Sequence, residues 1–167
     1  PTLLLAGDST LDDYGRKPRP PYASWGTELE KSMKPGCKVN NFAKSGASTK
    51  SFIDAGHWAK LIAAVKPGDY VGIQFGHNDE KQKRPGCGAW GHFIYNLKIY
   101  IDEARARGAH PVLVTPTQRR SFDNNGKIQD THLDFPDAMR WLATKENIPP
   151  EELFLRISSA AHTAYTL

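Results

Sequence analysis

Ser9 stands in the stretch GDST, residues 7–10, where a glycine, an acid and two hydroxyls follow an apolar run. A serine hydroxyl in such a turn is a candidate nucleophile, because a neighbouring base can activate it. The Ser9 backbone N–H, at the start of the turn, can bind the anion that the attack creates. We therefore interpret Ser9 as a nucleophile for acyl transfer. Gly7 is expected to let the chain turn sharply, and Asp8 to fix the turn by bonding nearby backbone amides.

Two further stretches, SGAS around Gly46 and GHND at residues 76–79, supply hydrogen-bond donors for the same anion. Gly46 has no side chain, so its amide can approach a substrate oxygen closely. Asn78 offers a side-chain N–H, and one such donor is typically worth about 3 kcal/mol in an acyl-transfer transition state. Within GHND, we expect His77 to be a structural hydrogen-bond partner and Asp79 to hold the turn. Together these residues have the composition of an oxyanion hole.

Apolar and amphipathic segments alternate along the chain and predict the elements that must position these residues. Uninterrupted apolar runs are typical of strands buried in a parallel sheet, and a 3.6-residue apolar period indicates helices. Strands are expected at residues 2–6, 38–43, 69–76 and 110–116, and helices at residues 22–34, 50–66, 93–104 and 136–147, the last entered through Asp134 as a cap. This alternation predicts a central parallel sheet with helices on both faces.

The carboxyl ends of the four predicted strands are all polar. They read AGDST, NFAKSGAST, FGHNDEK and VTPTQRR. Any one of them is unremarkable as a polar turn, but the ends of parallel strands meet at one rim, where such folds bind ligands. The fourth end carries Arg119 and Arg120, which either face solvent or pair with the carboxylate of an acidic sugar.

Tryptophan positions suggest which aromatic side chains face a substrate. Trp90 lies in a glycine-rich loop and is the candidate substrate platform, whereas Trp25 and Trp141 lie on apolar helical stripes and are expected in the core. We assign the remaining lone histidines to the surface: His57, His92 and His110.

Length and composition predict one soluble domain over residues 1–167. The chain is 39% hydrophobic, and its net charge of +4 comes from basic residues interleaved with acidic ones, so no nucleic-acid partner is expected. No segment approaches the roughly 20 apolar residues of a membrane span, and no leader precedes the first predicted strand. The sequence does not decide between a cytoplasmic protein and one that is secreted after removal of a leader.

The two cysteines, Cys37 and Cys87, allow at most one disulfide and do not settle the compartment. Cys87 and His92 lie five residues apart, but tetrahedral zinc needs three or four ligands at motif spacing, and we find no second pair. No metal and no cofactor is therefore expected.

The motifs GDST, KSGAST and GHND, in this order, resemble the first three sequence blocks of the SGNH/GDSL hydrolases. Within that superfamily, GHNDEK, YIDEARARGAHPVLVTP and RRSFDNNGKIQDTHLDFPDAMRWLA are similar to the bacterial rhamnogalacturonan acetylesterase group, over residues 2 to about 148. The resemblance implies a three-layer α/β/α, flavodoxin-like SGNH hydrolase fold. It implies a serine esterase without a metal that removes acetyl groups from pectic polysaccharide. Ser9 would be the nucleophile, and the Ser9 amide, Gly46 and Asn78 the oxyanion donors.

The family places its base in a late Asp-x-x-His block, and here the sequence departs from the pattern. Residues 148–167 read IPPEELFLRISSAAHTAYTL, in which Ser159 stands where the acid is expected and His162 keeps the histidine position. Prolines at 149 and 150 disfavour a central strand. We therefore expect residues 1–148 to be family-like and residues 149–167 to form a shortened or altered tail.

Three explanations for the base remain open. His162 acts as the base without an acid to orient it, or His132, between Asp130 and Asp134, is recruited instead of serving helix entry or substrate contact. Alternatively the chain is a catalytically impaired remnant or a carbohydrate-binding module. A short-chain acyl esterase or thioesterase is a further alternative. The expected partner is an acetylated polysaccharide or a small acyl ester, and a shortened sheet would expose an edge through which homo-oligomers can form.

Overall fold

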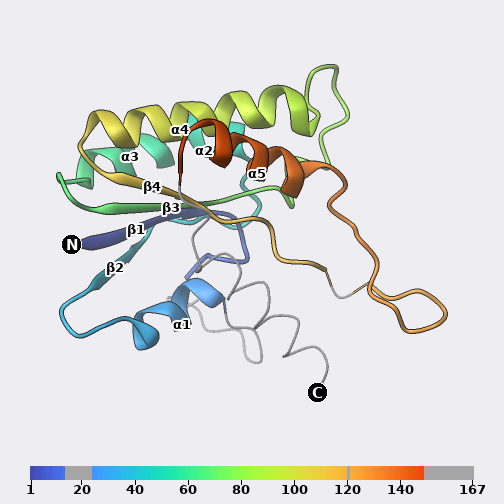
Figure 1. The fold of residues 1–167 in the computed structure, drawn as a ribbon, viewed down its shortest axis with the longest axis horizontal. Coiled ribbons are helices and arrows are strands. Elements are labelled where there is room, and N and C mark those ends of the chain that lie inside the picture. The colour runs from blue at the N-terminus through green and yellow to red at the C-terminus, as the bar shows by residue number, and fades with distance from the viewer. Residues whose placement is uncertain (14–23, 120, 149–167) are drawn as a thin grey trace.

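The computed structural model describes residues 1–13, 24–119 and 121–148. A four-stranded sheet runs through its centre (Figure 1). The strands are β1 (Thr2–Gly7), β2 (Lys38–Asn41), β3 (Tyr70–Gln74) and β4 (His110–Leu113). All pairings are parallel, in the order β2-β1-β3-β4. This is the order of flavodoxin-like sheets, so the predicted α/β architecture is confirmed.

Helices cover both faces of the sheet and complete three layers. They are α1 (Trp25–Ser32), α2 (Thr49–Asp54), α3 (His57–Ala64), α4 (Ile94–Ala106) and α5 (Phe135–Lys145), with a π-helical turn, η2 (Ala89–Phe93), immediately before α4. Figure 1 shows α1 on one face and the other four α-helices on the opposite face. None of the described helices is long and apolar enough to cross a membrane.

The two faces of the sheet carry cores of unequal size. The larger one, under α2 to α5, gathers the aromatic side chains Phe52, Phe75 and Tyr100, all fully buried. The smaller one, under α1, consists of Leu3, Leu5 and Leu11, against which half-buried Trp25 packs. Because successive strand residues point to opposite faces, β1 contributes Leu4 and Ala6 to the larger core.

Three local predictions were wrong. The expected helix 50–66 is two helices, because Gly56 adopts a left-handed φ of 74° between α2 and α3. Asp134 does precede α5, but its side chain caps no backbone N–H of that helix. Gly7 lies in the strand without a positive φ; a Cβ there would lie 2.3 Å from Leu11 Cδ1, so the glycine allows close packing rather than a sharp turn.

Candidate active site

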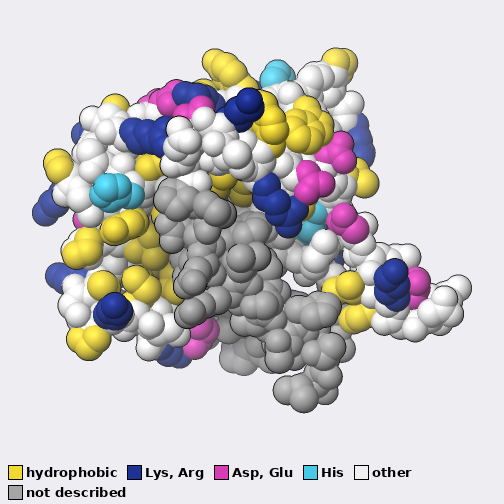
Figure 2. All heavy atoms as spheres, in the orientation of Figure 1, with side chains coloured by type: hydrophobic (Ala, Val, Ile, Leu, Met, Phe, Trp, Pro, Cys, Tyr) yellow, Lys and Arg dark blue, Asp and Glu magenta, His cyan; other side chains and the backbone are white. Residues whose placement is uncertain are grey.

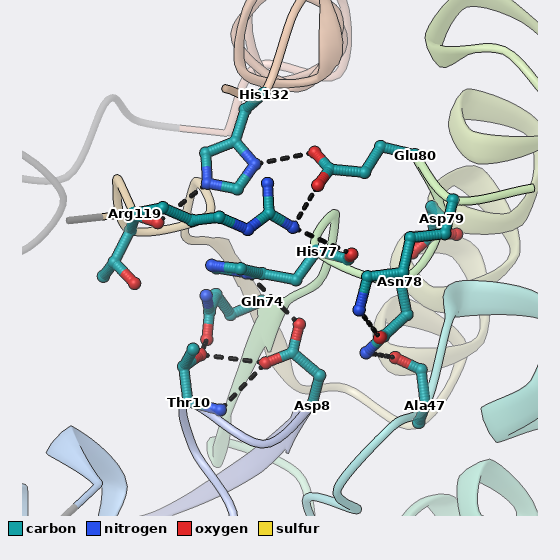
Figure 3. Close-up of polar contacts among 12 residues, drawn as sticks. Asp8, Thr10, Ala47, Gln74, His77, Asn78, Asp79, Glu80, Arg119 and His132 are labelled. Carbon is teal, nitrogen blue, oxygen red and sulfur yellow. Dashed lines mark hydrogen bonds and ion pairs between the residues drawn. The ribbon is translucent and has the colours of Figure 1, made fainter. Parts of the chain in front are cut away.

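Direct hydrogen bonds join the ends of β1, β2 and β3 at one rim. The Lys44 N–H donates to the Gly7 carbonyl over 2.9 Å, which ties the segment after β2 to the end of β1. The Asn78 side chain donates through Nδ2 to the Ala47 carbonyl, also over 2.9 Å, which ties the turn after β3 to the same segment (Figure 3). The predicted convergence of these three polar strand ends is therefore present in the structure.

The turn that carries Ser9 is fixed by Asp8. The carbonyl of Asp8 accepts from the N–H groups of Leu11 and Asp12, which closes one helix-like turn over residues 8–12. Asp8 Oδ1 accepts from the Thr10 N–H over 2.9 Å, as predicted, and also lies 2.9 Å from the Thr10 hydroxyl. Because Asp8 is fully buried, the backbone around Ser9 is held from inside the molecule.

The second carboxylate oxygen of Asp8 faces His77. Asp8 Oδ2 lies 3.5 Å from His77 Nδ1, and neither atom has a hydrogen-bond partner within the described residues. The His77 and His132 rings meet edge to face, with 4.5 Å between ring centroids and 74° between planes. His77 is thus packed between the Ser9 turn and the segment before α5, but its Nδ1 does not form the predicted structural hydrogen bond with any described residue.

Two successive residues of the GHND turn form hydrogen bonds with the segment that follows Gly46. Asn78 bonds to Ala47, while buried Asp79 accepts from the Thr49 N–H over 3.0 Å and from the Thr49 hydroxyl over 2.5 Å. Asp79 thereby anchors its turn to the first residue of α2. Burial raises the pKa of Asp79 to about 6, against the opposing effect of the Thr49 hydrogen bonds.

Gly46 lies between these anchored residues and the end of β2, in the left-handed region at a φ of 79°. A side chain there would meet nothing within 4 Å, so the conformation rather than space calls for glycine. Asn78 keeps a second Nδ2 hydrogen, because an amide nitrogen has two and Ala47 takes one. Its Oδ1 accepts from Lys81 Nζ over 3.0 Å, which fixes the amide orientation.

Glu80, which the sequence did not single out, joins Arg119 and His132 near the rim. Its carboxylate contacts the Arg119 guanidinium through one oxygen and lies 2.8 Å from His132 Nδ1 through the other (Figure 3). Arg119 also donates to the His77 carbonyl over 3.2 Å. Nothing in a single sequence marks Glu80, since its partners lie 39 and 52 residues away.

These contacts disfavour two site predictions. Arg119 is paired within the chain, because Glu80 neutralises its charge. His132 has no exposed surface, and its Nε2 lies 2.8 Å from the Thr117 carbonyl while its Nδ1 contacts Glu80. A buried imidazole with both ring nitrogens occupied is a poor candidate for a base or a substrate contact. Arg120 and His162 lie outside the described residues.

Trp90 is 54% exposed, as the platform prediction requires, and its indole Nε1 donates to Asp134 Oδ2 over 3.1 Å. Trp141 is 46% exposed and meets Trp90 edge to face, with 6.0 Å between ring centroids. The prediction that Trp141 belongs to the core was therefore wrong. The described residues hold no group of three or more histidine, cysteine or acidic side chains that could bind a metal ion.

Residues 5–161 match the GDSL-like Lipase/Acylhydrolase family. The chain is 42% identical over 154 residues to the rhamnogalacturonan acetylesterase RhgT of Bacillus subtilis, covering 92% of this chain and 65% of RhgT. It is 34% identical over 151 residues to the probable rhamnogalacturonan acetylesterase YesY of the same species, covering 87% of this chain and 67% of YesY. This chain thus spans about two thirds of the length of these relatives.

Two solved structures show the same fold. The crystal structure of YxiM from Bacillus subtilis superposes with a TM-score of 0.80 at 26% identity, over 95% of this chain and 45% of YxiM. That of Axe2, an acetylxylan esterase from Geobacillus stearothermophilus, gives a TM-score of 0.63 at 19% identity, over 87% of this chain and 73% of Axe2. The sequence match over nearly the whole chain, its likeness to the rhamnogalacturonan acetylesterases and the shared fold agree, and the chain belongs to the GDSL-like lipase/acylhydrolase family.

Proposed function

We propose that the chain is a serine esterase that removes acetyl groups from an acetylated polysaccharide. The observation that carries this proposal is the joining of three strand ends, through Lys44–Gly7 and Asn78–Ala47 hydrogen bonds, around the turn that contains Ser9. Such an arrangement supports a site in which the Ser9 hydroxyl acts as nucleophile and backbone and amide donors bind the oxyanion. Preorganised donors are what an acyl-transfer transition state needs, because its charge develops on the carbonyl oxygen.

In this proposal the Ser9 hydroxyl attacks the acetyl carbonyl and gives up its proton to a base. The oxyanion is bound by the N–H groups of Ser9 and Gly46 and by Asn78 Nδ2. When the tetrahedral intermediate collapses, the bond to the sugar oxygen breaks, the protonated base gives its proton to that oxygen, and an acetyl group stays on Ser9. Water then attacks this ester, releases acetate and restores the hydroxyl.

The base that the proposal assigns is His162. Two described histidines near the rim are poor substitutes. His132 is buried with both nitrogens occupied, and His77 Nδ1 faces Asp8. His92 Nδ1 lies 3.7 Å from Cys87 Sγ, in the loop that leads into α4. His162 keeps the histidine position of the family's late block, where Ser159 replaces the acid.

The names of RhgT and YesY support an acetylated rhamnogalacturonan as the substrate. A polysaccharide also suits the exposed aromatic side chain of Trp90 beside the rim. Rhamnogalacturonan is accordingly the first polymer to test.

The test is acetate release from acetylated rhamnogalacturonan and from p-nitrophenyl acetate near pH 8. We expect the intact chain to turn over both esters, and Ser9→Ala and His162→Ala to fall to background. Ser32→Ala, an exposed serine at the end of α1, serves as the matched control and keeps full activity. Equal rates for the intact chain and Ser9→Ala would refute the proposal, and full activity of His162→Ala would refute the assignment of the base.

A further inference from the structure

Trp90 and Trp141 form an exposed aromatic pair that the proposed chemistry does not use. The two indoles come from different elements, η2 and α5, and both are about half exposed. In Figure 2, exposed hydrophobic side chains lie beside basic ones where α5 runs over α4 in Figure 1. Large apolar groups held at a surface mark binding sites more often than isolated ones do.

The loop that presents Trp90 is held rigidly. The His92 N–H donates to the Gly86 carbonyl over 2.8 Å, and the Gly91 N–H to the Gly88 carbonyl over 3.1 Å. A Cβ on Gly91 would lie 2.3 Å from the Gly86 oxygen, so the loop closes only with glycine there. Together with the indole bond to Asp134, these contacts fix the orientation of Trp90 before any ligand arrives. A fixed aromatic side chain loses little entropy on binding.

A cation completes the group. Lys145 Nζ lies 5.8 Å from the centroid of the Trp141 ring, and among the described residues the Lys145 side chain forms neither a hydrogen bond nor an ion pair. No described carboxylate neutralises its ammonium, unlike the Arg119 guanidinium, which pairs with Glu80. Apolar rings beside a free cation complement a sugar that offers C–H groups and a carboxylate, because the face of an aromatic ring carries partial negative charge.

The aromatic pair is connected to the rim through the segment before α5. Asp134, which holds Trp90, lies two residues after His132, whose ring contacts His77. From Asp134 to Lys145, α5 extends about 16 Å at 1.5 Å per residue, long enough for several sugar units.

We propose that Trp90, Trp141 and Lys145 bind the acidic sugar units of a polysaccharide whose acetyl group is cleaved at the Ser9 rim. This inference rests on the proposed function, because the bound polysaccharide would run along α5 toward Ser9. It moves the recognition of the acidic sugar from Arg119 to Lys145.

The test measures binding separately from turnover, in the full chain carrying Ser9→Ala. The probes are an acetylated rhamnogalacturonan oligosaccharide, which is acidic, and an acetylated xylan oligosaccharide without acidic substituents. We expect Trp90→Ala and Trp141→Ala each to raise the Kd about tenfold for both probes. Lys145→Gln raises the Kd severalfold for the acidic probe alone and reduces its dependence on salt. Matched controls are Tyr70→Ala, an exposed aromatic at the opposite end of β3, and Lys60→Gln, an exposed lysine on α3.

Unchanged Kd values in both tryptophan variants overturn the inference, and so does a Lys145→Gln effect equal for both probes. If a tryptophan variant does not fold, binding is followed instead in the Ser9→Ala protein, by the NMR chemical shifts of its indole N–H groups. Those of Trp90 and Trp141 shift on titration with the acidic probe, whereas shifts confined to Trp25 and Trp58 contradict the inference. Failure of the proposed function is distinguished by p-nitrophenyl acetate: if that function holds, the intact chain and the Tyr70→Ala and Lys60→Gln controls hydrolyse it equally, and Ser9→Ala does not.

Discussion

Asn78 illustrates how neighbouring residues prepare one side chain for catalysis. Its amide is held at both ends, by the Ala47 carbonyl at Nδ2 and by Lys81 Nζ at Oδ1. The remaining Nδ2 hydrogen therefore has a defined direction without any ligand present. A donor fixed in this way needs no reorganisation when charge develops on a substrate oxygen.

Asn78→Ala is predicted to lower kcat on p-nitrophenyl acetate about 10²- to 10³-fold and to leave KM nearly unchanged, because the donor acts mainly in the transition state. Steady-state kinetics measure both constants. Asn125→Ala, an exposed asparagine in the loop before Lys127, is the control and keeps the kcat of the intact chain. A rise in KM at constant kcat would show instead that Asn78 contributes only to ground-state binding.

At this scale the sequence predicted side-chain types better than side-chain partners. Asp8, Gly46 and Asn78 follow apolar strands, so their place at the rim was predictable from the order of elements. The pairing of Arg119 and His132 was not predicted, because their common partner, Glu80, is distant in sequence. The core prediction for Trp141 was wrong because its position on the apolar stripe of a helix did not show that its ring packs against Trp90 at the surface.

Among the elements, α2 depends on the turn after β3 for its position. Asp79 binds the first residue of α2, Thr49, whose carbonyl accepts from the Tyr100 hydroxyl over 2.8 Å and whose hydroxyl accepts from Asn96 over 2.9 Å. A buried network thus joins the GHND turn, α2 and α4. Burial disfavours the charged form of Asp79, which raises its pKa.

This pKa makes stability depend on pH. The folded-state pKa of about 6 exceeds the ordinary value of 3.8, so the unfolded chain ionises Asp79 first as pH rises. The stability that Asp79 contributes is full below pH 3.8 and is lost as pH rises through 6. Asp79→Asn removes this titration, so the free energy of unfolding of the variant, relative to that of the wild type, should rise by about 2 kcal/mol between pH 4 and 7. Urea unfolding at several pH values measures the difference, and a difference that is constant across this range contradicts the prediction.

Glu80, in the turn after β3, links two further segments, because its partners lie after β4 and before α5. Glu80→Gln leaves Arg119 and buried His132 without their carboxylate, and we predict a loss of about 3 kcal/mol in the free energy of unfolding. Glu28→Gln is the matched control, since Glu28 pairs with Lys31 on the exposed face of α1. That variant should change stability by less than about 1 kcal/mol. Equal effects of the two substitutions in chemical denaturation would contradict the importance assigned to Glu80.

Element boundaries were less predictable than element types. The apolar period continues from α2 into α3, so the sequence predicted one helix, and only the left-handed Gly56 separates the two. Glycine inside a helical pattern is compatible with either outcome, because its helix penalty is only about 1 kcal/mol.

For the whole molecule, one sheet separates two cores that share β1. We predict that both cores unfold in one cooperative transition. Phe52→Ala in the larger core and Leu11→Ala in the smaller one, both fully buried, should each lower the free energy of unfolding by about 3 kcal/mol or more. Each variant should keep coincident transitions by fluorescence and circular dichroism. Separate transitions in either variant would show that the two cores are independent units.

Association between chains stays a prediction at this scale. Within the described residues β2 and β4 are the outer strands of the sheet, and an outer strand offers unpaired backbone groups to a second chain. Sedimentation velocity over a range of concentrations distinguishes a monomer from a reversible dimer.

The central claim, that the joined strand ends form an acyl-transfer site around Ser9, is tested most directly by trapping the covalent intermediate. The intact chain is mixed with p-nitrophenyl acetate, quenched in acid within the first turnover, digested and mapped by mass spectrometry. We predict one acetyl group on the peptide that contains Ser9 and none on that peptide in Ser9→Ala. Acetylation of a different side chain at the rim, or acetate release with Ser9 unmodified at every quench time, would contradict the account.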